Sequence, residues 1–133
     1  MILTKECDYA LRIIRQLSDY KIQTVTRICE NESIPKKFAY KILKRLENVS
    51  ILKSYRGQSG GYKLVAELEN VTLYDIIQSV NNDIYLNRCV GENFDCPNNT
   101  SEKVCMVHTE FCRIQELLEQ TLKEKSIKEI LQK

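Results

Sequence analysis

Residues 51–65 read Ile51-Leu52-Lys53-Ser54-Tyr55-Arg56-Gly57-Gln58-Ser59-Gly60-Gly61-Tyr62-Lys63-Leu64-Val65. Two short segments of alternating apolar and polar residues flank a glycine-rich turn, which is the pattern of a β-hairpin. Three of the chain's four glycines lie in this stretch. The preceding segment, 24–49, predicts two helices joined by a tight turn. A helix-turn-helix followed directly by a hairpin is a winged helix, so this stretch decides the fold class: mainly α with a small β-hairpin wing.

The two helices before the hairpin have recognisable ends. Thr24 is expected to cap the first, whose inward side carries Val25, Ile28 and Cys29. Ser33-Ile34-Pro35 breaks the chain, with Ser33 or Ile34 as the cap of the second helix and Pro35 in its first turn. The second helix is predicted from Lys36 to about Asn48. Its predicted buried side is Phe38, Ile42, Leu43 and Leu46.

The second helix is also strongly basic. Five cations lie within residues 36–45, with no acidic residue until Glu47. This local positive field is concealed by a net charge of only +2. A surface helix kept soluble by lysines has a similar composition, but the order helix, turn, helix and wing favours DNA, with this helix in the major groove and the wing on phosphate or the minor groove. The predicted DNA-binding residues are Lys36, Lys37, Tyr40, Lys41, Lys44, Arg56, Gly57, Ser59 and Lys63.

Helical patterns flank this core on both sides. Residues 1–20 predict a helix capped by Thr4, with its apolar side formed by Leu3, Cys7, Ala10, Leu11, Ile14 and Leu17. Capping boxes at 72–75 and 126–129 predict two further helix starts. Residues 109–125 predict a long amphipathic helix with Phe111, Ile114, Leu117, Leu118 and Leu122 on one side. Because such a helix has little of its own chain to pack on, we expect it to form a homodimer.

Composition narrows the class of protein further. At 133 residues and 43% hydrophobic content, the chain is expected to form one small domain with an extension. It has no apolar run of eighteen residues and no signal-peptide pattern. We therefore expect a cytoplasmic protein without membrane contact. Six cysteines in a reducing compartment do not predict disulfides.

Four of the six cysteines and the only histidine fall between Cys89 and Cys112. The gaps between them are six, eight and six residues, so the short paired knuckles typical of zinc are absent from the sequence. A thiol switch needs only two cysteines. An iron–sulfur cluster takes three or four thiolates at irregular spacing. The spacing favours the cluster and leaves zinc and thiol chemistry as alternatives. Cys7 and Cys29, at apolar helix positions, are expected in the core.

Four parts of the sequence match one pattern: the opening Leu3-Thr4 and Asp8-Tyr9-Ala10-Leu11-Arg12, the wing Arg56–Leu64, the segment Val71–Ile77 and the cysteine loop. Together they resemble the bacterial winged-helix regulators that include IscR, NsrR and RirA. The resemblance covers nearly the whole chain. The wing pattern R-G-x-x-G-G-Y-x-L, followed by T-L-x-D-I-I, is fairly specific to this family, and the cysteine loop is the feature of its cluster-binding members.

The resemblance implies a homodimer that binds double-stranded DNA at a palindromic operator and carries one cluster per subunit. It assigns Cys89, Cys96 and Cys105 as ligands, although the gap before Cys105 is longer than in the family and Cys112 is additional. The fourth ligand varies among members: an aspartate of the partner subunit, at the place of Asp8, or a histidine, at the place of His108. We expect Asp8, with His108 and Cys112 as alternatives. If Asp8 is not a ligand, its carboxylate only interacts favourably with the positive end of the helix dipole. If His108 is not a ligand, it is a cap or surface residue.

The resemblance divides the chain into a winged helix-turn-helix domain at 1–80, a cysteine-rich cluster-binding loop at 81–108, and a dimerisation helix with a C-terminal turn at 109–133. By analogy with NsrR and RirA, a 4Fe-4S cluster is favoured over 2Fe-2S. The expected function is a transcription regulator, a repressor rather than an enzyme, that senses cluster status, nitric oxide, oxidant or iron. A cluster-free thiol switch and a zinc-stapled interaction protein are the alternatives.

Overall fold

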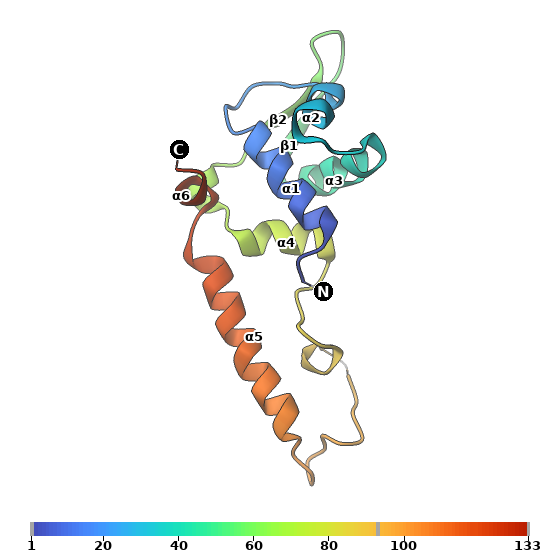
Figure 1. The fold of residues 1–133 in the computed structure, drawn as a ribbon, viewed down its shortest axis with the longest axis vertical. Coiled ribbons are helices and arrows are strands. Elements are labelled where there is room, and N and C mark those ends of the chain that lie inside the picture. The colour runs from blue at the N-terminus through green and yellow to red at the C-terminus, as the bar shows by residue number, and fades with distance from the viewer. Residues whose placement is uncertain (1, 93, 133) are drawn as a thin grey trace.

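The computed structural model describes residues 2–92 and 94–132. Its helices are α1 (Lys5–Gln16), α2 (Val25–Glu32), α3 (Lys36–Asn48), α4 (Leu73–Asn81), α5 (Met106–Glu124) and α6 (Ile127–Leu131). Its strands are β1 (Leu52–Tyr55) and β2 (Gly61–Leu64), and its 3-10 turns are η1 (Leu68–Asn70) and η2 (Arg88–Val90). Helices α1–α4 and the hairpin form one body, from which α5 projects, whereas α6 returns to the body (Figure 1). The predicted fold class, mainly α with a hairpin wing, is confirmed.

The core lies where α1 packs against α2, α3 and α4. Its fully buried side chains are Ile13, Ile14, Leu17, Ile28, Ile42, Leu43, Leu46, Leu52, Leu64, Ile76, Ile77 and Val80. Cys7 and Cys29 are also buried in this core, as predicted. Burial removes the thiol of Cys29 from water and raises its pKa. These two cysteines are therefore structural.

The first helix begins as predicted and ends earlier. The hydroxyl of Thr4 accepts the backbone N–H of Cys7 at 3.3 Å and caps α1. The assignment of Leu3 to the apolar side is wrong, because Leu3 precedes the helix and is 61% exposed. Ile13, which the predicted stripe omits, is fully buried instead. The helix stops at Gln16, with Leu17 as its C-cap.

The turn between α2 and α3 differs from the prediction at two residues. Ser33 is the C-cap of α2, in the left-handed conformation with φ 55°, and Pro35, without a side-chain bond, is the N-cap of α3. Phe38 was predicted to be buried, but it is 41% exposed and its ring centroid lies 6.0 Å from that of Tyr9. Ala39 takes the buried position, because it shares a helical face with Ile42, Leu43 and Leu46.

The wing is a two-stranded antiparallel hairpin in which Leu52 pairs with Leu64 and Tyr55 with Gly61. It is joined to the segment before α2, because Gln23 and Tyr62 exchange backbone hydrogen bonds of 2.9 and 2.8 Å. Gly61 permits this close approach: a Cβ at its position would lie 2.2 Å from the carbonyl oxygen of Gln23, and its φ is +150°. The glycine pattern of the sequence therefore has a steric cause.

The C-terminal segment folds back on the winged body. The backbone N–H of Ile127 donates to the carbonyl of Val71 at 2.7 Å, and Ser126 forms a β-bridge with Thr72. Both predicted capping boxes are present, Thr72 with Asp75 and Ser126 with Glu129. The two boxes thus start neighbouring helices and bring the end of α5 to the start of α4.

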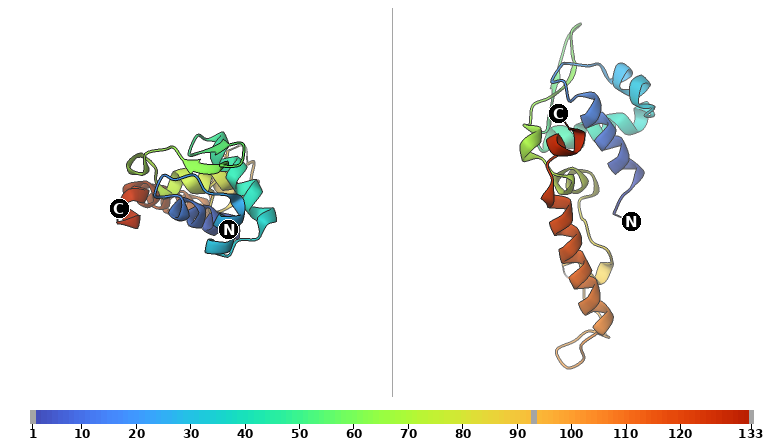
Figure 2. Two further views of the ribbon diagram at one scale, coloured as in Figure 1. Left: turned by 90° about the horizontal axis from the view of Figure 1, so that it is seen from above. Right: turned by 60° about the vertical axis from the view of Figure 1, so that its left-hand side comes forward.

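Helix α5 begins at Met106, three residues before the predicted start at 109, because Cys105 acts as its N-cap. Figure 2 shows from a second side that α5 and the segment leading to it extend away from the winged body. Within the part of the chain that the structure describes, no helix is long and apolar enough to cross a membrane.

Candidate functional site

A buried glutamine holds the cysteine loop against α5. Gln115 is 5% exposed and is the buried residue of that helix. Its amide nitrogen donates to the carbonyl of Ile84 at 2.7 Å, and its amide oxygen accepts the N–H of Leu86 at 2.9 Å. The side-chain amide of Gln115 therefore bonds to one backbone carbonyl and one backbone N–H of the loop, as the backbone of a neighbouring strand would. Gln115 is not among the residues predicted for the site, although it is a polar residue on the helix side of the apolar positions Phe111, Leu118 and Leu122.

The loop and α5 enclose a hollow of about 700 Å³. All four loop cysteines, Cys89, Cys96, Cys105 and Cys112, line it together with His108, and each cysteine is half-buried. The structure thus brings together every cysteine that the sequence marks as a candidate ligand, and separates them from Cys7 and Cys29. Among residues 2–92 and 94–132, no three Cys, His, Asp or Glu side chains converge closely enough to hold a single metal ion.

Short local contacts place two of these cysteines. The carbonyl of Cys96 accepts the N–H of Asn99 at 3.0 Å, and the side-chain oxygen of Asn99 accepts the N–H of Cys105 at 3.1 Å. The sulfur of Cys105 in turn accepts the N–H of His108 at 3.5 Å, at the start of α5. Cys105 is thereby fixed at the start of α5, and Asn99 links it to Cys96.

Cys112 lies one helical turn beyond His108. Its Sγ is 3.4 Å from Nε2 of His108. Nδ1 of the same ring is buried and has no hydrogen-bond partner among the described residues. Both side chains line the hollow, so both alternative ligands from the sequence lie beside the cysteines of their own chain.

Asp8 lies apart from this hollow. It sits in the exposed part of α1, where its carboxylate pairs with Arg12 at 3.0 Å. It lines a different hollow, of about 420 Å³, with Leu11, Arg15 and Ile130. Within one chain, the structure therefore does not bring Asp8 to the cysteines.

The DNA-binding candidates of α3 are all on its exposed side. Lys36, Lys37, Tyr40, Lys41 and Lys44 are exposed. Two of these ammonium groups have carboxylate partners: that of Lys41 lies on α1, distant in sequence, and that of Lys44 lies on α3 itself.

Lys41 lies 2.7 Å from Glu6 of α1, and Lys44 lies 3.8 Å from Glu47. The hydrogen bond from Lys41 is the main reason that the pKa of Glu6 is lowered. The hydroxyl and the backbone N–H of Ser54 at the base of the wing lower the pKa of Glu47, and Lys44 adds to this. Both carboxylates are thus held in the charged form beside the basic helix.

The wing carries its predicted residues at and below its tip. Arg56, Gly57 and Ser59 are exposed in the turn. Lys63 is half-buried on β2 and pairs in register with Lys53 of β1. Like charges directly opposite each other across two strands repel. An anion bound by both ammonium groups would relieve that repulsion.

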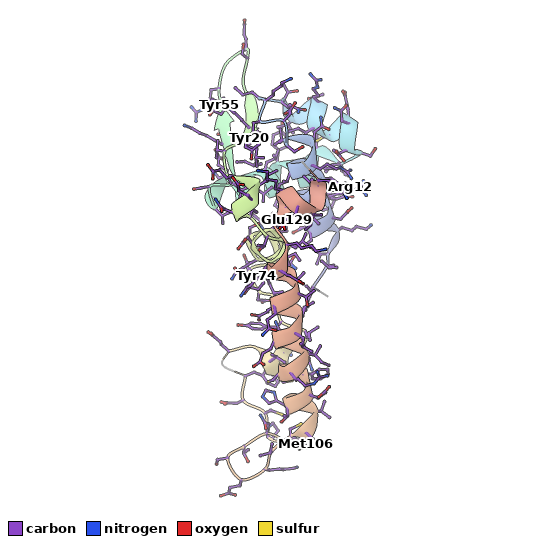
Figure 3. All side chains as sticks on the ribbon, turned by 90° about the vertical axis from the view of Figure 1, so that its left-hand side faces the viewer. Arg12, Tyr20, Tyr55, Tyr74, Met106 and Glu129 are labelled. Carbon is purple, nitrogen blue, oxygen red and sulfur yellow. The ribbon has the colours of Figure 1, made fainter. Side chains whose placement is uncertain are left out.

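The wing and the cysteine hollow lie at opposite ends of the molecule. In Figure 3, Tyr55 at the base of the wing turn and Met106 at the start of α5 mark these two ends. The cysteines and the predicted DNA-binding residues of the wing are thus far apart within one chain.

The sequence and the fold were compared with those of known proteins. The sequence model of the family Rrf2, described as "Iron-dependent Transcriptional regulator", matches residues 3–133. The transcriptional regulator NsrR of Bacillus subtilis is 26% identical over 96 residues, which cover 70% of this chain and 66% of that protein. The chain thus spans about two thirds of the length of this relative.

Two solved structures have the same fold. IscR of T. potens aligns with a TM-score of 0.74 at 17% identity, over 98% of this chain and 85% of that one. CymR of B. subtilis, described as its global cysteine regulator, aligns with a TM-score of 0.76 at 18% identity, over 98% of this chain and 95% of that one.

Proposed function

The chain belongs to the Rrf2 family of transcriptional regulators, and we propose that it is an iron–sulfur-dependent DNA-binding regulator that acts as a repressor. In this proposal residues 1–80 bind DNA, residues 81–108 hold the cluster and residues 109–133 form the dimer. A cytoplasmic location is part of the same proposal.

The convergence of the four loop cysteines on one hollow is the observation that carries this proposal. Cys89, Cys96 and Cys105 would hold the cluster, because thiolates are the protein ligands of such clusters. A cluster offers several iron atoms to its ligands, so the sulfurs need not meet at one point as they would around a single ion. The half-buried state of these cysteines provides both shielding and access for a small molecule. When bound, the group supplies a centre whose integrity depends on iron, oxidant and nitric oxide.

The fourth ligand is proposed to be Asp8 of the partner subunit. A carboxylate is a harder donor than a thiolate and suits this type of centre less well, so it forms the weakest link of the ligand set. Asp8 is exposed and its only charged contact among the described residues is Arg12. His108 and Cys112 are the alternatives within the same chain. The resemblance to NsrR supports the four-iron cluster over the two-iron type.

The dimer that this ligand set requires is supported by the uncovered side of α5. Ile114 is 36% and Leu117 50% exposed on α5, and Val107, which also lines the cysteine hollow, is 62% exposed. These positions are spaced seven and three residues apart, which makes one stripe along the helix. Pairing of two such stripes would remove them from water and set the distance between two copies of α3. A palindromic operator has half-sites at one matching spacing.

The DNA face proposed for each copy consists of α3 and the wing. Tyr40, Lys41 and Lys44 would meet base edges and nearby phosphates, Lys36 and Lys37 would meet phosphates at the start of the helix, and Arg56, Gly57, Ser59 and Lys63 would lie along the backbone at the wing. Phosphate contacts supply affinity and register, whereas base contacts supply specificity. A tie between the cysteine loop and the partner's α1 would hold both faces at the operator spacing.

A thiol switch without a cluster is the second candidate, supported by the 3.4 Å contact of Cys112 with His108. A zinc-stapled protein is the third. Purification without oxygen, followed by a visible spectrum and assays of iron, acid-labile sulfide and zinc per chain, separates the three. We expect a brown protein with iron and sulfide. A colourless protein without metal would support the thiol switch, and one zinc per chain would support the staple.

A further inference from the structure

An acidic residue of α1 reaches across to the basic helix α3. Glu6 lies in the first turn of α1, and its two carboxylate oxygens contact two cations of α3. Oε1 lies 2.7 Å from Nζ of Lys41, and Oε2 lies 3.4 Å from Nη1 of Arg45. The contacts join residues that are 35 and 39 positions apart in sequence. No pattern within the helix predicts them.

The carboxylate is held in place from two sides. Arg45 is only partly exposed, and its guanidinium also donates to the carbonyl of Val80 at the end of α4. That carbonyl is among the last of the helix and lacks a partner within it. Arg45 is thereby fixed between α1 and α4, and Glu6 is fixed with it. The side chain of Glu6 is 24% exposed, whereas that of Lys41 is 52% exposed and lies on the DNA face.

The ammonium of Lys41 therefore has two possible anionic partners. One is the carboxylate of Glu6, which is already in place, and the other is a DNA phosphate. Each phosphate contact of a cation adds to sequence-independent affinity and steepens its dependence on salt. While Lys41 is paired with Glu6, it contributes less to this affinity. Lys36 and Lys37 have no such carboxylate partner among residues 2–92 and 94–132.

We propose that Glu6 restrains sequence-independent DNA binding by competing with phosphate for Lys41. The inference rests on the proposed DNA-binding function but not on the cluster. Because non-specific sites on a genome greatly outnumber operators, an acidic residue that weakens sequence-independent binding reduces the amount of protein held at those sites. Arg45 keeps the carboxylate beside α3 and has a positioning role.

Binding of the full-length chain to a duplex of random sequence, measured at several salt concentrations, tests this. Glu6→Gln keeps the side-chain shape and an oxygen that accepts from Arg45, but it removes the charge that holds Lys41. The variant should bind random DNA more tightly, by roughly threefold at low salt. The slope of log K against log salt should steepen by about 0.9, the change for one added phosphate contact. Thermal unfolding would confirm that the variant is folded.

Two further variants serve as controls for Glu6→Gln. Glu30→Gln removes the same charge from an exposed residue of α2, and it should leave the slope unchanged. Glu6→Gln combined with Lys41→Met should lose the gain of Glu6→Gln alone. An unchanged slope for Glu6→Gln, or a gain that persists without Lys41, would overturn the inference. Failure of the unaltered chain to bind any DNA would overturn the proposed function and this inference with it.

Discussion

The side-chain nitrogen of Gln115 donates to the carbonyl of Ile84 at 2.7 Å, and through this contact α5 holds the start of the cysteine loop. The same amide accepts the N–H of Leu86. The glutamine thus satisfies two backbone groups of the loop with one buried side chain. The position of the cysteines relative to α5 depends on it.

Gln115→Leu should therefore destabilise the protein by about 1–3 kcal/mol, because the buried hydrogen bond to the carbonyl of Ile84 and the partly buried one from the N–H of Leu86 are both lost. Urea unfolding measures this change in the free energy of unfolding. Gln120→Leu is the matched control, since Gln120 is exposed on the same helix, and it should change stability by less than about 0.5 kcal/mol. Equal effects of the two substitutions would show that the loop is held by other contacts.

Substitutions of the loop cysteines and of the core cysteines should differ in their effect on the iron content of the protein. Cys89→Ala, Cys96→Ala and Cys105→Ala should each abolish retention of iron, since each removes a proposed thiolate ligand. Cys7→Ala and Cys29→Ala remove small buried groups, and they should cost about 1–2 kcal/mol of stability while iron is retained. Iron and acid-labile sulfide per chain are the quantities to measure. Full iron content in the Cys105 variant would transfer the third ligand role to Cys112.

Asp8→Ala should leave iron bound through the three cysteines but change the visible spectrum and weaken the effect of the cluster on DNA affinity. His108→Ala and Cys112→Ala should do neither. Each of the three substitutions removes one proposed or alternative ligand, so the three spectra compare the candidates directly. A holo dimer with an imidazole or a fourth sulfur on the iron would exclude Asp8 and leave the three-cysteine assignment in place.

Arg56→Ala at the exposed wing tip should weaken binding to all DNA sequences alike. Loss of one phosphate contact should reduce the slope of log K against log salt by about one. Lys44→Ala, on α3 near Glu47, should weaken operator binding more than binding to random sequence if it contacts a base edge. Unchanged binding of Arg56→Ala and Lys41→Ala to the operator at every salt concentration would contradict the proposed DNA face.

The fold followed from the sequence wherever a local rule determines structure. Glycine spacing predicted the wing, and Gly61 is needed because a side chain there would meet the backbone of Gln23. Thr4, Thr24 and both capping boxes started helices as predicted, because a side-chain oxygen reaches the N–H of a residue only three positions away. The grouping of the loop cysteines on one hollow also agrees with their closeness in sequence.

The features that the sequence did not predict depend on contacts between distant segments. Phe38 and Ala39 are adjacent, and their burial was decided by the direction in which α3 packs on α1, not by hydrophobicity. Glu6 meets Lys41 only because α1 crosses α3, and Gln115 is buried only because the loop returns along α5. Ser33 ends α2 instead of starting α3. Serine is a common residue at the start of a helix, and the sequence does not show that Ser33 takes the left-handed conformation that ends one.

The proposed function requires that the state of the cysteine site controls DNA affinity. The most direct test is to prepare the protein without oxygen, measure its affinity for a selected operator, and repeat the measurement on the same sample after the metal has been removed with a chelator. We expect operator affinity to change by at least tenfold while affinity for random sequence changes little, because only the operator requires two α3 helices at one fixed spacing. Equal operator affinity before and after removal, or a preparation that contains no iron, would contradict the claim.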